Sequence, residues 1–413
     1  MPVAAVPNYL GKDFSTASPG MRFGMYLKLW GINEQSKKLL WTTHDVIYRI
    51  RGRDKREREL EEDNKRAAID TACRLTQGDT DLMQALILRQ QTLAATMEPK
   101  RLLTVFSQSI APFSTGLGNE HPLENGFAFL WPYGLPYLPG SGVKGVLRQA
   151  ARELAGLVED VSWDENYGWN TDVIEVLFGR ESEEGEQAHC RGVLSFWDVI
   201  PKIEGGRLMV EIMTPHQHDY YQKGQSPHDS GQPTPITFLT VPPRSNFTFH
   251  IHCDRNRLQQ LAPDLARNER WKNLLESAFQ HAFDWLGFGA KTAVGYGAMR
   301  RDEEAEKAAE RELEENRRRA EEEARLTDLS PLERELEEIS TREKNNNVGV
   351  VLLNLLDEGR WENAADKRMV AAKIKALWQA EKKWNPDFSG TNRSRLKQKA
   401  RCEKVVAYLQ SED

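Results

Sequence analysis

A stretch rich in glycine carries the clearest chemistry in this chain. Within eleven residues it holds four glycines, with a lysine and a threonine between them: Gly287, Gly289, Lys291, Thr292, Gly295 and Gly297. Glycine permits positive φ and has no Cβ, so such a backbone is able to approach another group closely. Consecutive N–H groups of the loop form a concave site for an anion. We therefore expect contact with a phosphate or a carboxylate, and Lys291 supplies positive charge.

Two interpretations of this loop stay open. In the first, its backbone contacts a nucleic acid or a nucleotide; in the second, the glycines only relieve crowding in a tight connection from a helix to a strand. A Walker A loop is excluded, because it requires glycine directly before the lysine and Ala290 stands there instead. The sequence therefore argues against a nucleoside triphosphatase.

A second turn of similar character precedes a predicted helix at residues 139–148. It contains Gly140, Ser141, Gly142, Lys144, Gly145 and Arg148. Ser141 is a candidate N-cap, since its hydroxyl is able to accept from an amide one turn further on. The start of a helix offers free N–H groups and the positive end of its dipole. A lysine in this first turn opposes the dipole, so a nearby anion would explain Lys144.

Histidines raise the possibility of catalysis or metal binding. His216 and His218 are close in sequence to His228, Asp219 and Asp229. Metal ligands must converge in space, and this spacing matches no metal signature. A histidine also serves as a general acid or base in RNA cleavage, and His44 is a further candidate. We favour contact of His216 and His218 with RNA or a partner, with no catalytic residue, no metal and no cofactor.

The elements that position these turns follow a recognisable order. Strands are predicted at residues 101–110, 193–199, 207–213, 236–241 and 246–253, amphipathic helices follow residues 140 and 270, and a strand-like run covers 294–299. Leu103, Val105 and Ser107 share one face of the first strand, and Phe247, Phe249 and Ile251 share one face of a later strand. This order predicts an α+β protein with a ferredoxin-like, RRM-like core that carries insertions. Such a sheet is a common platform for single-stranded RNA.

The regions outside this core differ in composition. We predict an N-terminal arm and helical region over residues 1–100, with helix from about residue 45, and the ferredoxin-like core over 101–300. A charged helical linker follows over 301–345, and a small basic helical module over 346–413. Three roles stay open for the cations of that module. They form a solvated face, they bind RNA phosphates, or they contact an acidic partner.

Composition limits the classes of protein. The chain has 413 residues, 39% of them hydrophobic, and a formal net charge of −6. It lacks a run of roughly 18 apolar residues, the minimum for a membrane span. Its four cysteines form no CxxC pair, which argues against a disulfide scaffold and against a cysteine zinc site. We expect a cytoplasmic protein that does not contact a membrane.

The two glycine-bearing turns resemble the hallmarks of a known family. Residues 287–297 are similar to the C-terminal glycine-rich loop of the RAMP superfamily of CRISPR-associated proteins, and residues 139–148 to its PGSS-type turn. Gly142 stands where a second serine is more usual. Residues 116–122 with 133–137, and 213–221 with 233–241, resemble the sixth-subunit family of the type III-B (Cmr) effectors. The resemblance covers roughly residues 100–300.

The resemblance implies a non-catalytic subunit that caps the far end of a guide-RNA filament. Such a subunit holds the 3′ part of the guide and the matching end of the target duplex, while neighbouring backbone subunits cut the target. The implied partners are the guide RNA, the target RNA and other Cmr-type subunits, namely the backbone and small subunits and the terminal RAMP subunit. Two alternatives stay open: a RAMP-type metal-independent endoribonuclease that processes guide RNA, and a protein-binding assembly adaptor.

Overall fold

The computed structural model describes residues 6–11, 13–27, 30–32, 39–41, 46–51, 57–62, 64–122, 125–158, 167–180, 190–214, 235–343 and 347–410. The chain divides into two compact units, residues 1–310 and 311–413, and the boundary falls inside helix α10 (Glu303–Asp328). Among the described residues no helix is both long enough and apolar enough to cross a membrane. The predicted domain boundaries stay predictions.

The first unit is built around an antiparallel sheet of four strands. The strands and the two helices between them follow the chain as β5 (Leu102–Ser109), α4 (Gly140–Leu154), β10 (Leu194–Phe196), β13 (Asn246–Cys253), α9 (Arg270–His281) and β14 (Met299–Arg301). In the sheet the strands lie in the order β10-β13-β5-β14, and every neighbouring pair is antiparallel. This β-α-β-β-α-β order is the ferredoxin-like plan, which confirms the predicted fold class.

One face of this sheet forms the core with the two helices. Along β5 every second residue from Leu103 is buried, and in β13 Phe247, Phe249 and Ile251 are buried on the same side. The ring of Phe249 lies 5.2 Å from that of Phe279 on α9 and 5.0 Å from that of Phe288. Because successive side chains of a strand point to opposite faces, the predicted alternation in these two strands is confirmed.

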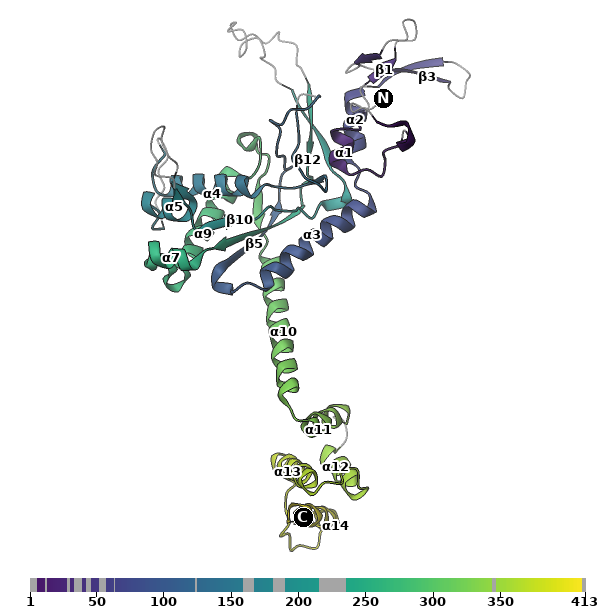
Figure 1. Cartoon of the computed structure of the whole chain (residues 1–413), viewed down its shortest axis with the longest axis vertical. Coiled ribbons are helices and arrows are strands. Elements are labelled where there is room, and N and C mark those ends of the chain that lie inside the picture. Colours follow the sequence, from purple (N-terminus) through teal and green to yellow (C-terminus); the bar gives the residue numbers. More distant parts are fainter. Residues whose placement is uncertain are drawn as a thin grey trace. The chain divides into compact units, whose positions relative to one another are not determined.

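Other elements surround the core. The insertion between β10 and β13 forms a hairpin of β11 (Met209–Met213) and β12 (Ile236–Thr240). Helix α5 (Thr171–Phe178) packs on α4, and α7 (Arg255–Leu261) and α8 (Pro263–Ala266) follow β13. Helix α3 (Gln77–Ala95) lies on the other side of β5 from α4 (Figure 1). Its Met83 packs with Leu135 and Ile200 in a cluster separate from the main core.

Two local predictions are wrong. The helix predicted from residue 45 begins only at α2 (Asn64–Cys73), because β3 (Val46–Arg51) and β4 (Glu57–Glu62) form a hairpin before it. Val46, Ile47 and Ile50 are β-branched and favour strands, a signal that the dense charges obscured. The strand-like run at 294–299 is a 3-10 turn and a bend, since Gly295 and Gly297 have φ of 93° and 70°. The strand begins only at Met299.

Among the described residues, the second unit contains four helices after α10. They are α11 (Pro331–Arg342), α12 (Val348–Asp357), α13 (Ala364–Ala380) and α14 (Arg393–Gln410). Ser330 and Glu333 form a capping box at the start of α11. The helical C-terminal extension is therefore confirmed (Figure 1).

The buried imidazole of His250 makes the stability of the first unit depend on pH. His250 on β13 is 5% exposed, and its Nδ1 lies 3.0 Å from the Thr104 hydroxyl. Burial lowers the pKa of His250 to about 4, whereas an unfolded histidine has a pKa of about 6.5. Between these values the unfolded chain binds a proton that the folded chain does not. The contribution of the neutral imidazole to the unfolding free energy is therefore complete above pH 6.5 and is lost as the pH falls toward 4.

We expect the wild-type protein to lose about 2 kcal/mol more of its unfolding free energy than His250→Gln between pH 7.5 and 5.0. Urea unfolding at both pH values measures this difference. The control is His252→Gln, which changes a partly exposed histidine on the same strand. Equal pH dependence in the wild-type and His250→Gln proteins would show that the buried imidazole does not govern acid stability.

Candidate nucleic-acid interface

Each of the two glycine-bearing turns lies just beyond the end of a strand of the sheet. Strands β5 and β10 both pair antiparallel with β13, so they run in the same direction. Just beyond the end of β5, the Gly297 amide donates to the Pro112 carbonyl at 2.8 Å. Just beyond the end of β10, the Gly140 amide donates to Asp198 Oδ1 at 2.8 Å. Phe196, the last residue of β10, pairs with Ile251, which pairs on its other side with Leu103, so the end of β10 is offset from Ser109 at the end of β5 by six residues, about 20 Å along the strand.

The first turn is held by a carboxylate that the sequence did not single out. Helix α4 begins at Gly140 with Pro139 as its N-cap residue, and no side chain of the cap accepts from the first turn. The predicted N-cap Ser141 is therefore wrong. A Cβ on Gly140 would lie 2.3 Å from the Phe196 carbonyl oxygen. This close approach requires glycine as the first helical residue and places Ser141 inside the first turn.

Removal of the Asp198 carboxylate should weaken the start of α4. We expect Asp198→Ala to lower the unfolding free energy by about 1 kcal/mol, the usual cost of losing a side-chain acceptor at a helix start. Asp198→Asn should cost much less, because its amide oxygen is able to accept the same hydrogen bond. Urea unfolding of both variants distinguishes the two effects. If the asparagine variant loses as much as the alanine variant, the negative charge and not the hydrogen bond stabilises the turn.

The exposed surface of this turn is largely backbone. Ser141, Gly142 and Gly145 are exposed, and a Cβ on Gly145 would meet no atom within 4 Å. Lys144 and Arg148 are partly buried at positions one turn apart. The amides of Gly140 and Gly142 already donate within the protein. The turn therefore presents an open glycine surface beside two cations.

The amides of the second turn are mostly occupied. Inside the loop, the Phe288 amide donates to Gly297, that of Gly295 to Thr292 and that of Tyr296 to Lys291. Toward β5, the Ala290 amide donates to the Ser114 carbonyl at 2.7 Å. Among the described residues, the amides of Gly289, Lys291, Thr292 and Ala293 show no such backbone acceptor. Phosphate contact by main-chain donors is thereby restricted to this short segment.

Most of the glycines in this loop relieve crowding, as the second interpretation proposed. A Cβ would lie 1.8 Å from the Phe288 oxygen at Gly297 and 2.3 Å from the Ser114 oxygen at Gly289. At Gly287 it would lie 3.2 Å from the Gly297 oxygen. Gly295 differs, because its φ is 93° but the space above it is open. Only Gly295 therefore leaves backbone accessible without a packing role.

Lys291 lies over the β11–β12 hairpin. Its φ is 61°, in the left-handed region that favours glycine. Its Nζ lies 3.2 Å from Met213 Sδ and 5.4 Å from the centre of the Phe238 ring. Beside it, the Tyr296 hydroxyl donates to Glu211 at 3.3 Å, and burial together with that carboxylate raises the pKa of Tyr296. Lys291 therefore carries its charge on the hairpin side of the loop, with Thr292 partly buried next to it.

The histidines divide into two groups. His216, His218, His228 and His44 lie outside the described residues, so their predicted roles stay predictions. His121 Nε2 contacts the Phe23 carbonyl at 2.9 Å, and burial lowers its pKa. His281 Nε2 lies 2.7 Å from Glu153 between α9 and α4. With His250, these buried or partly buried residues serve the fold, and the described residues contain no group of His, Cys, Asp or Glu able to hold a metal.

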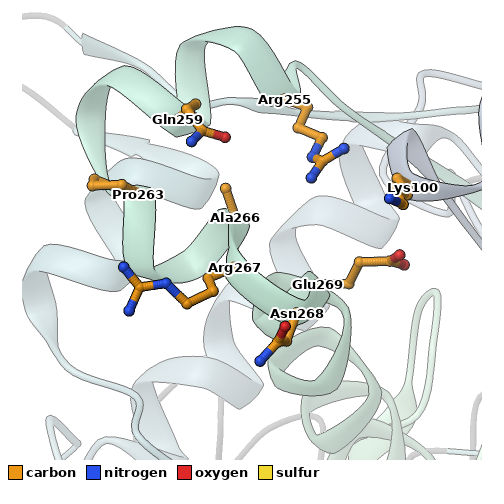
Figure 2. A pocket seen from close by; sticks show the side chains of 8 residues that line it. All are labelled: Lys100, Arg255, Gln259, Pro263, Ala266, Arg267, Asn268 and Glu269. Atoms are coloured by element: carbon orange, nitrogen blue, oxygen red, sulfur yellow. The ribbon is translucent and has the colours of Figure 1, made fainter.

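Sequence reasoning also missed a polar pocket of about 440 Å³. It lies beyond the end of β13, between α7 and the start of α9, and its lining includes Lys100, Arg255, Gln259 and Arg267. Arg255 and Gln259 point into it in Figure 2. The Arg255 Nε is buried without a hydrogen-bond partner among the described residues. No spacing in the sequence marks these cations, which come from three separate segments, and the predicted site does not include them.

The chain is similar to known proteins over its core. Residues 108–300 match the family model of the RAMP superfamily. The subunit Cmr6 of the Pyrococcus furiosus CRISPR system is 28% identical, and the match covers 45% of this chain and 63% of the relative. Cmr6 of Saccharolobus solfataricus is 29% identical, with 47% and 54% covered. The chain thus spans less than two thirds of the length of these relatives.

Solved structures show a weaker likeness. A type III-B Cmr-beta complex bound to cognate target RNA contains a chain with a TM-score of 0.40 and 18% identity, which covers 58% of this chain and 71% of that chain. The crystal structure of Cmr6 from Pyrococcus furiosus has a TM-score of 0.27 and 24% identity, with 49% and 98% covered.

Proposed function

Since residues 108–300 match the family model of the RAMP superfamily, we propose that the chain is a non-catalytic, RNA-binding subunit of a type III-B CRISPR effector complex. In this proposal it caps the filament at the 3′ end of the guide RNA and contributes to the channel that holds the guide–target duplex. Its partners are the guide RNA, the target RNA and the other Cmr-type subunits, and it acts in antiviral defence.

The observation that carries this proposal is the position of the two turns. Gly140 and Gly297 are far apart in sequence, yet their amides contact residues just beyond the parallel ends of β10 and β5. Lys144, Arg148 and Lys291 accompany the turns, so each turn combines at least one cation with accessible backbone. The curated relatives are both named Cmr6, which supports a place in the same kind of complex.

Each group has a distinct part in this proposal. Lys144, Arg148 and Lys291 attract phosphates, and the main-chain donors near Gly289 and Thr292 fix the path of the backbone. Contacts to phosphates position a nucleic acid but carry no sequence information. Base pairing between guide and target reads the sequence in RNA-guided systems. We therefore expect this subunit to retain guides of any sequence.

Purification from cells that also express the partner subunits and a CRISPR array tests the proposal. We expect the tagged chain to co-purify with a short RNA of defined length and with other Cmr-type subunits. Recovery of the assembled subunits without RNA attached to this chain would favour an assembly adaptor instead. Incubation of the isolated chain with repeat RNA in chelator tests its lack of catalysis. Cleavage that is lost in His44→Ala or His216→Ala would replace the proposal with an endoribonuclease.

A further inference from the structure

The helical unit after α10 has a core of its own. Leu336 on α11, Leu352 and Leu356 on α12, Trp378 on α13 and Val405 on α14 are all buried in one cluster. The Trp361 indole donates to Glu335 at 2.9 Å, which ties the connection after α12 to α11. Because the apolar residues face inward, the surface of this unit is free to carry another function.

The surface of α13 and α14 is strongly basic. Residues 363–404 contain 12 Lys or Arg residues against four Asp or Glu residues, an excess of eight positive charges. The whole chain, by contrast, has a formal net charge of −6. The cations are Lys367, Arg368, Lys373, Lys375, Lys382, Lys383, Arg393, Arg395, Lys397, Lys399, Arg401 and Lys404. We call this set the basic surface.

Cations at the start of α14 are not explained by local stability. Arg393, Arg395 and Lys397 are exposed in the first two turns, and the first turn contains no acidic residue. The positive end of the helix dipole lies there, so cations at this position destabilise the helix. Asn392 accepts from the amides of Ser394 and Arg395, which caps the helix without adding negative charge. An external polyanion would offset this unfavourable arrangement.

Few carboxylates neutralise these cations within the unit. Lys404 pairs with Asp357 at 2.6 Å and Lys383 with Glu381 at 2.7 Å, and two further lysines of the set, Lys373 and Lys399, lie 3.8 Å from Glu337 and Glu403. In the part of the chain that the structure describes, Arg393, Lys397 and Arg401 have no carboxylate within 4.0 Å. The arginines of α10 differ, since Arg317 and Arg319 pair with glutamates of their own helix at 2.8 and 2.5 Å. Charge on α14 is therefore available to a partner, whereas charge on α10 is largely compensated.

Aromatic rings lie next to this charge. The Arg395 guanidinium lies 5.7 Å from the centre of the partly exposed Phe388 ring, and Lys375 Nζ lies 5.7 Å from that of Trp384. Proteins that bind single-stranded nucleic acids without sequence preference combine a basic track with aromatic faces on which bases stack. The basic surface has both components.

We propose that the basic surface binds the phosphodiester backbone of single-stranded RNA, independently of sequence and of the two glycine-bearing turns. This RNA contact goes beyond the proposed function, because it is a second contact and lies in a unit outside the RAMP match. Its chemistry also suits a DNA backbone, so the experiment includes both nucleic acids.

The test uses the full chain and fluorescence anisotropy with a labelled polyuridine RNA across a salt titration. The variant replaces four cations of α14 (Arg393→Gln, Arg395→Gln, Lys397→Gln and Arg401→Gln). Glutamine keeps good helix propensity, and circular dichroism checks that the helices persist. We expect the slope of log K against log salt to fall by about 3, since each phosphate contact to a single strand contributes about 0.7. Affinity at low salt should fall at least tenfold.

The matched control neutralises four arginines of α10 (Arg311→Gln, Arg317→Gln, Arg318→Gln and Arg319→Gln), with the same change in net charge. Unchanged RNA binding in the α14 variant, or an equal loss in the control, overturns the proposal. Loss of co-purified subunits from the α14 variant with intact RNA binding shows an acidic protein partner instead. Stronger binding of polythymidine DNA than of RNA refutes the assignment to RNA.

The outcome is separable from that of the proposed function. The α14 variant keeps both glycine-bearing turns. Its retention of the guide RNA in the complex is therefore a readout of the proposed function that is independent of polyuridine binding. Conversely, a variant that lacks Lys144 and Lys291 keeps the basic surface.

Discussion

Replacement of Gly297 by alanine should lower the unfolding free energy by about 3 kcal/mol, a large part of the 5–15 kcal/mol typical of a folded protein. A Cβ at this position would lie 1.8 Å from the Phe288 carbonyl oxygen and 2.9 Å from its carbonyl carbon. These atoms belong to the backbone and have little freedom to move, because the Phe288 amide is bonded to the Gly297 carbonyl at 2.9 Å. The clash therefore displaces Phe288.

Displacement of Phe288 would disturb the centre of the core. Its side chain is fully buried, and its ring lies 5.0 Å from that of Phe249 and 5.8 Å from that of Phe283. The positive φ of 70° adds strain for any residue with a Cβ. Urea or thermal unfolding of Gly297→Ala measures the combined cost.

The matched control is Gly295→Ala in the same loop. Its φ is 93°, but no atom lies within 4 Å of the added Cβ. We expect only conformational strain, roughly 1–2 kcal/mol. If both alanine variants lose the same free energy, the tight packing of the loop against Phe288 is not what requires glycine at position 297.

Simultaneous replacement of Lys144 and Lys291 by alanine should weaken guide-RNA binding about 10- to 30-fold near 0.1 M salt and reduce the salt slope by about 1.4. Each lysine supplies one cation to a glycine-bearing turn, beyond the end of β10 or of β5. Filter binding of the guide RNA across a salt titration measures both quantities. The side chains are partly buried but lie outside the main core, so the variant should still fold.

The matched control replaces Lys100 and Arg267, which line the pocket beyond the end of β13, away from both turns. It removes the same charge from a place outside both turns. We expect its affinity for the guide to fall by less than the affinity of the variant that lacks Lys144 and Lys291. Equal losses would indicate general attraction of RNA by positive charge and not a site at the turns.

Periodic patterns in the sequence predicted the sheet and its helices well. Phe247, Phe249 and Ile251 alternate along β13, and Trp271, Leu274, Leu275, Ala278 and Phe279 form the buried stripe of α9. Such patterns are local, since each element must bury one face. The hairpin of β3 and β4 was not predicted, because charged residues dominate the composition of 46–62 and obscure the β-branched residues among them.

The chemistry of the two turns was harder to predict, because it depends on contacts between distant segments. The amide of Ala290 finds its acceptor at Ser114, and the amide of Gly140 finds Asp198. No local spacing identifies these partners. The glycines marked both turns correctly, but only coordinates distinguish a glycine that avoids a clash, such as Gly289, from one with open space, such as Gly145.

Photocrosslinking of the assembled complex with a guide RNA that carries 4-thiouridine near its 3′ end tests the central claim most directly. Mass spectrometry of the crosslinked peptides locates the RNA on the chain. We predict adducts on peptides that contain residues 140–148 and 289–295. Crosslinks from this chain that fall entirely outside both turns, while other subunits crosslink to the same guide, would contradict it.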